Sequence, residues 1–205
     1  MDHTTTILSR LRCIPMAKAF RPIQAPSLAA ALRESGLKVL NVSQQMQEGN
    51  LLVRALAKDY PDILVGGGNV QTLEEAQRAI EEGASFIFSP VFDVKMIKYC
   101  LSHKVSIFPV TTDGQRCRKL NLEVLGFYPV DKLGGFPVID KLGEEFKLKF
   151  IVAGHITELD MDTFLGNPHV LAMTGSWMFD KGAIAANNWK EITESLKRAR
   201  NWVIE

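Results

Sequence analysis

The segment Leu122-Glu123-Val124-Leu125-Gly126-Phe127-Tyr128-Pro129-Val130-Asp131-Lys132-Leu133-Gly134-Gly135 contains an apolar run, an aromatic pair, a proline and a Gly-Gly pair, in that order. An apolar run of this length is typical of a short buried strand. Proline and paired glycines mark the turn that follows such a strand. The segment therefore predicts one βα unit, with a strand over Leu122–Tyr128, a turn, and a helix over Pro137–Glu145.

The same unit recurs on both sides of this segment. The other predicted strands are Cys13–Phe20, Leu37–Ser43, Asp62–Gly66, Ser85–Ser89, Val105–Val110, Lys149–Ala153 and Val170–Thr174. The other predicted helices are Thr4–Arg12, Pro26–Ser35, Gly49–Asp59, Thr72–Glu82, Asp93–Ser102, Asp113–Leu120, Glu158–Leu165 and Asn188–Val203. Strict alternation favours parallel strands, and eight units favour a (β/α)8 TIM barrel, an α/β fold, here with a short N-terminal helix. An open doubly wound sheet is the alternative, because spacing alone does not show closure.

The segment from Thr72 to Gly83 shows how a helix is specified. Thr72 and Glu75 form the pattern of a capping box, and Gly83 is expected to end the helix. Leu73, Ala76 and Ile80 share one face, which predicts an amphipathic helix packed on the sheet.

Composition narrows the class of protein. The 205 residues suit a single domain over 1–205, and 46% hydrophobic with 23% charged residues is typical of a soluble globular protein. A net charge of +1 without basic runs gives no support for a nucleic-acid or anionic-membrane partner. No signal peptide or membrane span is predicted, and the three scattered cysteines favour reduced thiols, so we expect a cytoplasmic protein. The four histidines show no metal-ligand spacing, and no cofactor is expected.

Reactive groups of a (β/α)8 barrel lie at the carboxyl ends of its strands. Alternation along the second strand places Asn41, Ser43 and Gln45 on one face, which is either the wall of a site or a hydrated barrel mouth. The third strand ends in Gly66-Gly67-Gly68-Asn69, which matches neither a dinucleotide fingerprint nor a P-loop.

Several strand ends together resemble the 2-keto-3-deoxy-6-phosphogluconate (KDPG) and 4-hydroxy-2-ketoglutarate (KHG) aldolases. Their sixth strand typically has Phe-Lys-Phe-Phe-Pro followed by Gly-Gly, and the lysine forms a Schiff base with the substrate ketone. In this chain the lysine position is occupied by Gly126. A glycine has no amine, so the resemblance predicts the family fold without its covalent chemistry at that position.

The resemblance also assigns the other family positions. The catalytic glutamate falls on Asn41, the carboxylate-binding arginine on Gln45, and the two site threonines on Asn69 and Ala153. The residues that match the family are mainly those that shape loops, and they are Pro90, Pro129, Gly134, Gly135, Gly175 and Ser176. The expected substrate-binding residues are Asn41, Ser43, Gln45, Asn69, Pro90 and Tyr128.

The turns after the seventh and eighth strands are the usual phosphate site of such barrels. Here they contain Gly154 and His155, and then Gly175 and Ser176. His155 either caps its loop or contacts a ligand. The expected ligand is a phosphate or a neutral-tailed phosphate ester in preference to a free 2-keto acid, because the arginine position is Gln45.

Two functions remain open from the sequence. The first is a diverged family member that binds a small polar or phosphorylated metabolite without aldolase chemistry, or serves as a structural or regulatory partner. The second is an active lyase with an altered mechanism that uses Asn41, Ser43, Asn69, Tyr128 and His155, or with a relocated lysine, Lys18 or Lys132. A homotrimer is expected from the resemblance alone.

Overall fold

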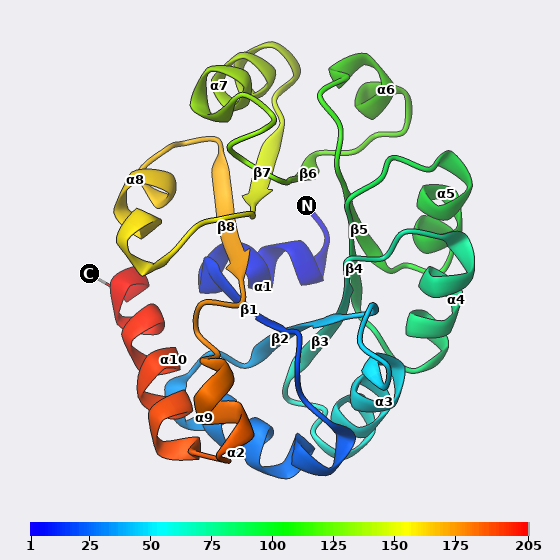
Figure 1. Cartoon of the computed structure of the whole chain (residues 1–205). Coiled ribbons are helices and arrows are strands. Elements are labelled where there is room, and N and C mark those ends of the chain that lie inside the picture. The colour runs from blue at the N-terminus through cyan, green and yellow to red at the C-terminus, as the bar shows by residue number, and fades with distance from the viewer. Residues whose placement is uncertain (205) are drawn as a thin grey trace.

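Eight parallel strands form a ring in the computed structural model, which describes residues 1–204 (Figure 1). The strands are β1 (Cys13–Ala17), β2 (Val39–Ser43), β3 (Leu64–Gly68), β4 (Phe86–Ser89), β5 (Ser106–Pro109), β6 (Val124–Phe127), β7 (Lys149–Val152) and β8 (Val170–Gly175). They are hydrogen-bonded in the order β5-β4-β3-β2-β1-β8-β7-β6. A single parallel bridge between Val110 and Gly126 joins the two end strands, so the predicted (β/α)8 barrel is confirmed and the open sheet is excluded.

Helices surround the ring and connect its strands (Figure 1). They are α1 (His3–Leu11), α2 (Ala25–Ser35), α3 (Gly49–Asp59), α4 (Leu73–Glu81), α5 (Val94–Ser102), α6 (Gly114–Lys119), α7 (Gly135–Phe146), α8 (Met161–Leu165), α9 (Lys181–Ala185) and α10 (Trp189–Ile204), with 3-10 turns η1 (Pro22–Gln24) and η2 (Glu158–Asp160). The sequence predicted the α-helices except α9. That helix spans only Lys181–Ala185, too short for a hydrophobic period to stand out.

The start of α4 differs in one detail from the predicted capping box. Thr72 accepts a hydrogen bond from the Glu75 backbone N–H, as predicted. The Glu75 carboxylate, however, accepts from the backbone N–H of Gln71 instead of closing the box on Thr72. Gly83 follows the helix with a φ of 101°, in the left-handed region that a glycine adopts without strain.

The barrel interior is filled by alternate residues of the strands. A buried cluster contains Ile14, Val39, Phe86, Phe88, Phe108, Val124, Ile151 and Ala172, with Leu8 of α1. Large rings on two strands require small residues on their neighbours. A Cβ at Gly66 would lie 2.2 Å from the Phe86 ring, so glycine there leaves the space that Phe86 fills.

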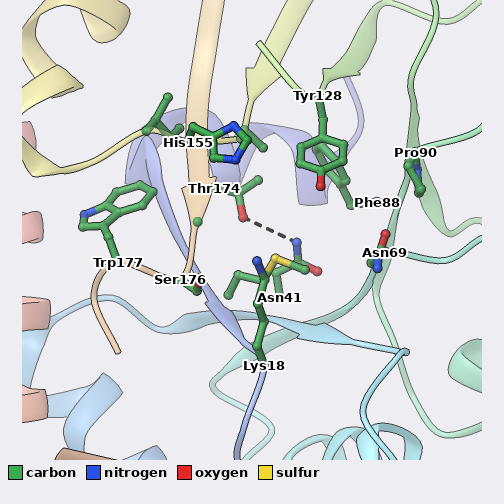
Figure 2. Close-up of a pocket in the computed structure, with 15 residues that line it drawn as sticks. Lys18, Asn41, Asn69, Phe88, Pro90, Tyr128, His155, Thr174, Ser176 and Trp177 are labelled. Atoms are coloured by element: carbon green, nitrogen blue, oxygen red, sulfur yellow. Dashed lines mark hydrogen bonds between the residues drawn. The ribbon is translucent and has the colours of Figure 1, made fainter. Parts of the chain in front are cut away.

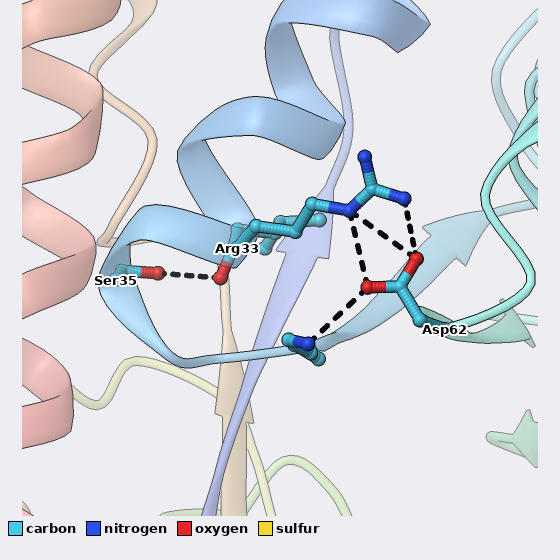
Figure 3. Close-up of polar contacts among 5 residues, drawn as sticks. Arg33, Ser35 and Asp62 are labelled. Atoms are coloured by element: carbon cyan, nitrogen blue, oxygen red, sulfur yellow. Dashed lines mark hydrogen bonds and ion pairs between the residues drawn. The ribbon is translucent and has the colours of Figure 1, made fainter.

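An exposed ion-pair cluster joins the outer ends of α2, β2 and β3. Arg33 lies at the end of α2, Lys38 immediately precedes β2, and both contact Asp62, which precedes β3 (Figure 3). Two nitrogens of the Arg33 guanidinium donate to the carboxylate, at 2.5 and 3.1 Å, and Lys38 Nζ lies 3.3 Å from Asp62 Oδ2. The cluster links the end of α2 and the start of β2 to the residues that precede β3.

No helix within residues 1–204 combines the length and the apolar character that crossing a membrane requires.

Candidate functional site

A cavity of about 340 Å³ opens at the carboxyl ends of the strands, where the sequence placed the site (Figure 2). It is lined by Met16, Lys18, Asn41, Asn69, Phe88, Pro90, Tyr128, Ala153, Gly154, His155, Ile156, Thr174, Gly175, Ser176 and Trp177. Most of the predicted site residues meet here. They are Asn41, Asn69, Pro90, Tyr128, Gly154, His155, Gly175 and Ser176.

Three predicted positions are not among the described lining residues, namely Ser43, Gln45 and Gly126. Ser43 is buried, and its hydroxyl accepts from the Gln45 backbone N–H at 3.3 Å. The exposed Gln45 side chain turns away and donates to the Asn69 carbonyl and to Glu75 Oε1, each at 3.2 Å. The position to which the resemblance assigns the carboxylate-binding arginine therefore does not reach this cavity.

The floor of the cavity is formed by Asn41 and Thr174, which are each 1% exposed. Asn41 Nδ2 donates to Thr174 Oγ1 at 3.4 Å, which is long for a hydrogen bond (Figure 2). Asn41 Oδ1 is buried and has no hydrogen-bond partner among the described residues. A buried amide group without a partner destabilises the fold by about 1–3 kcal/mol, so this atom is placed for a ligand or a water molecule.

The turns after β7 and β8 form one end of the cavity. Gly154 has a φ of 97°, and a Cβ there would lie 2.8 Å from Pro129 Cα. Within the described chain, the backbone N–H groups of Gly154, His155 and Ser176 donate to no protein acceptor. Free N–H groups in turns that line a cavity suit an anion.

His155 stands at the rim of this end with a φ of 51°, which is unusual for a residue with a side chain. Its side chain is 76% exposed, and Nδ1 lies 3.5 Å from Asp131 Oδ1. The ring therefore lines the cavity and also contacts the loop after β6, and its contact with a ligand stays a prediction.

Gly126 lies inside the barrel wall, against two aromatic residues. A Cβ at this position would lie 2.8 Å from Phe88 Cζ and 3.0 Å from the Phe108 carbonyl oxygen. A longer side chain at residue 126 would have to displace the Phe88 ring before it could reach the cavity.

The two lysines considered as replacements lie in different surroundings. Lys18 follows β1 and lines the cavity, whereas Lys132 is exposed and is not among the described lining residues. Figure 2 shows Lys18 extending from the end of β1 toward Asn41. Both lysines are exposed, and only Lys18 lies in the described lining of the cavity.

Sequence reasoning also missed Thr174 and Phe88 as parts of the site. Both follow the period of two along their strands. Thr174 lies two residues after the inward-facing Ala172, and Phe88 two residues after Phe86. The period-two alternation of side chains, counted along each strand from an inward-facing residue, would have identified both.

The buried cysteines do not add a nucleophile. Burial raises the pKa of Cys13 to about 12, that of Cys100 to about 12 and that of Cys117 to about 11. Each therefore stays a neutral thiol near pH 7. Within residues 1–204 no three His, Cys, Asp or Glu side chains are grouped as a metal site would require.

The family model for KDPG and KHG aldolase matches residues 5–195. The chain belongs to this aldolase family. A 2-dehydro-3-deoxy-phosphogluconate aldolase of Treponema pallidum is 32% identical over 190 residues, which cover 91% of this chain and 90% of that protein. An enzyme of the same name from Haemophilus influenzae is 28% identical over 200 residues, 94% of each chain.

Solved structures of the family share the barrel described above. The 2-keto-3-deoxy-6-phosphogluconate aldolase of Zymomonas mobilis, crystallised with 3-phosphoglycerate, superposes with a TM-score of 0.86 at 25% identity, covering 97% of this chain and 95% of that one. A KDPG aldolase from Legionella pneumophila superposes with a TM-score of 0.88 at 24% identity, covering 96% and 97%, and supports the fold.

Proposed function

We propose that this member of the aldolase family binds a small phosphorylated metabolite in the barrel-mouth cavity, in the cytoplasm, without forming a Schiff base at residue 126. The observation that carries the second part is Gly126 itself. It has no amine, and its Cβ position is already crowded by Phe88 and Phe108. Class I aldol cleavage needs the iminium as its electron sink, so loss of the lysine removes the reaction and not merely an accessory.

The absence of a carboxylate in the cavity supports the same proposal. None of the fifteen described lining residues is Asp or Glu. Asn41, at the family glutamate position, is an amide and transfers no proton near neutral pH. General acid–base catalysis typically contributes ~10²–10⁴-fold, and this site offers no carboxylate to supply it.

The phosphate end of the ligand is proposed to lie at Gly154, His155, Gly175 and Ser176. The free N–H groups of these turns support an anion there, and the Ser176 hydroxyl is a further donor. The cavity volume of about 340 Å³ suits a small metabolite. The Zymomonas mobilis relative was crystallised with 3-phosphoglycerate, which makes that ester a reasonable probe.

Calorimetric titration with inorganic phosphate and with 3-phosphoglycerate tests the proposal. A hydrogen bond to a charged group contributes about 1.5 kcal/mol or more, so we expect Ser176→Ala to weaken binding on the order of tenfold. Ser102→Ala is a matched control, because this exposed serine on α5 is not among the described lining residues and contacts only Tyr99 and His103 by hydrogen bonds. Absence of binding at millimolar concentrations, or equal affinity for wild type and Ser176→Ala, would refute the phosphate site.

A second candidate is an active lyase with a relocated lysine. One observation favours it, which is that Lys18 lines the cavity while Lys132 does not. If a Schiff base forms in this protein, Lys18 is the residue that carries it.

A further inference from the structure

His155 holds a backbone conformation that its residue type does not favour. Its φ is 51°, and that of the preceding Gly154 is 97°, so the turn after β7 has two successive residues in the left-handed region. A glycine adopts this region without strain, whereas a residue with a Cβ does not. Backbone strain of this kind collects at ligand sites, where contacts made in the site offset it.

The contacts of the His155 ring within the described chain offset little of that strain. The side chain is 76% exposed, and its ion-pair partner within residues 1–204 is Asp131, with Nδ1 3.5 Å from Oδ1. An exposed pair at that distance stabilises a fold little. The ring also lines the cavity, at the end where the backbone N–H groups of Gly154 and Ser176 have no acceptor in the described chain (Figure 2). It is therefore placed to gain a stronger contact from an anion than it has from the protein.

The charge of the cavity lining depends on pH through this ring. The ionisable side chains among the described lining residues are Lys18, Tyr128 and His155. Histidine is the residue type whose charge ordinarily changes between about pH 5 and 8, whereas lysine and tyrosine ordinarily titrate above about pH 9. His155 is therefore the lining residue that gains or loses charge near neutral pH.

The other charged groups around this turn lie outside the cavity lining. Asp131, after β6, faces the ring and is its counter-charge when the ring is protonated. Lys132, next to it, is exposed. On η2, Glu158 pairs with an arginine of α10 at 3.7 Å, and Asp160 accepts hydrogen bonds from the residue that caps the turn. An anion in the cavity thus competes for the His155 ring with one exposed carboxylate, that of Asp131.

We infer that protonated His155 binds the anion at the phosphate end of the cavity and makes its binding depend on pH. The imidazolium exchanges Asp131 for the anion, to which it donates a charge-assisted hydrogen bond. The neutral ring lacks the charge, so the added affinity is present at low pH and is lost as pH rises through the titration of the ring. This inference rests on the proposed function and adds regulation by pH to the same site.

Sulfate separates the charge of the protein from that of the ligand. A phosphate ester loses a proton near pH 6, at about the pH where histidine titrates, whereas sulfate stays a dianion throughout. We expect calorimetry to show that the affinity of wild type for sulfate falls about tenfold between about pH 5.5 and 8.5. His155→Gln and His155→Gly should have, at both pH values, about the affinity of wild type at the higher one. Glycine suits the backbone of residue 155, so that variant keeps the turn.

Proton uptake gives a second readout, which a purely structural role of the ring would not change. Near pH 7, wild type should take up protons when sulfate binds, so the observed enthalpy should vary with the ionisation enthalpy of the buffer. In His155→Gln it should not vary.

His103→Gln is the matched control, because His103 is exposed, stacks on Tyr99 and is not among the described lining residues. It should keep the wild-type fall in affinity, and thermal melting should show that each variant is folded. Equal affinities of wild type at the two pH values, no sulfate binding at the lower one, or a fall retained in His155→Gln would overturn the role of His155. The phosphate site would still stand if inorganic phosphate or 3-phosphoglycerate binds. If no anion binds at either pH, the proposed function fails and this inference fails with it.

Discussion

Gly126 and Phe88 share one small volume of the barrel wall, and that packing has consequences for any attempt to restore the family chemistry. A Cβ at residue 126 would lie 2.8 Å from Phe88 Cζ, closer than unbonded carbon atoms approach. A lysine introduced there would begin its side chain inside the space of the ring. The chain therefore lacks the lysine amine, and in addition the neighbouring side chains fill the space that a side chain at residue 126 would need.

We expect Gly126→Ala to destabilise the protein by about 1–3 kcal/mol in urea unfolding, because it overpacks the wall. In a Phe88→Ala background the same substitution should cost less, by on the order of 1 kcal/mol, because the ring that it meets is gone. Equal costs in the two backgrounds would mean that Phe88 does not limit the space at residue 126.

At the scale of elements, Asp62 holds α2 and the start of β2 to the start of β3 (Figure 3). The hydrogen bonds from Arg33 lower the pKa of Asp62 from 3.8 to about 2, with Lys38 contributing in the same direction. A carboxyl group whose pKa is lower in the folded state stabilises the fold above its unfolded pKa and loses that contribution as pH falls through the folded one.

Asp62→Asn should therefore lower the thermal midpoint at neutral pH, by a small amount, because the ion pair is exposed. The difference from wild type should shrink between pH 3.8 and about 2 and vanish below that range. Thermal melts of the two proteins across this range decide the matter. A difference that is the same at every pH would mean that the charge of Asp62 makes no contribution.

The strands and helices were predictable because each is specified locally. Alternating apolar runs gave all eight strands, and α3 was predicted at its observed bounds, Gly49–Asp59. Barrel closure was not visible in spacing, since it depends on one bridge between Val110 and Gly126, which the alternation of strands and helices does not specify. The site was partly predictable for the same reason. The direction of the Gln45 side chain and the entry of Lys18 into the cavity depend on packing between different strands, which a single sequence does not show.

At the scale of the whole molecule, we propose that the protein is a homotrimer, a proposal that rests on the family resemblance. Light scattering at micromolar concentration should give the mass of three chains of 22.8 kDa each. The mass of a single chain under those conditions would contradict the trimer and leave the fold and the cavity unaffected.

We propose that this aldolase-family barrel does not form the Schiff base of its relatives. Incubation with pyruvate and borohydride, followed by peptide mapping in a mass spectrometer, tests it directly, because borohydride converts an imine into a stable amine. A sample without borohydride controls for other modification. We predict no reduced pyruvate adduct on any lysine. An adduct that maps to Lys18 would contradict the account and would show that the reactive amine has moved from β6 to the end of β1.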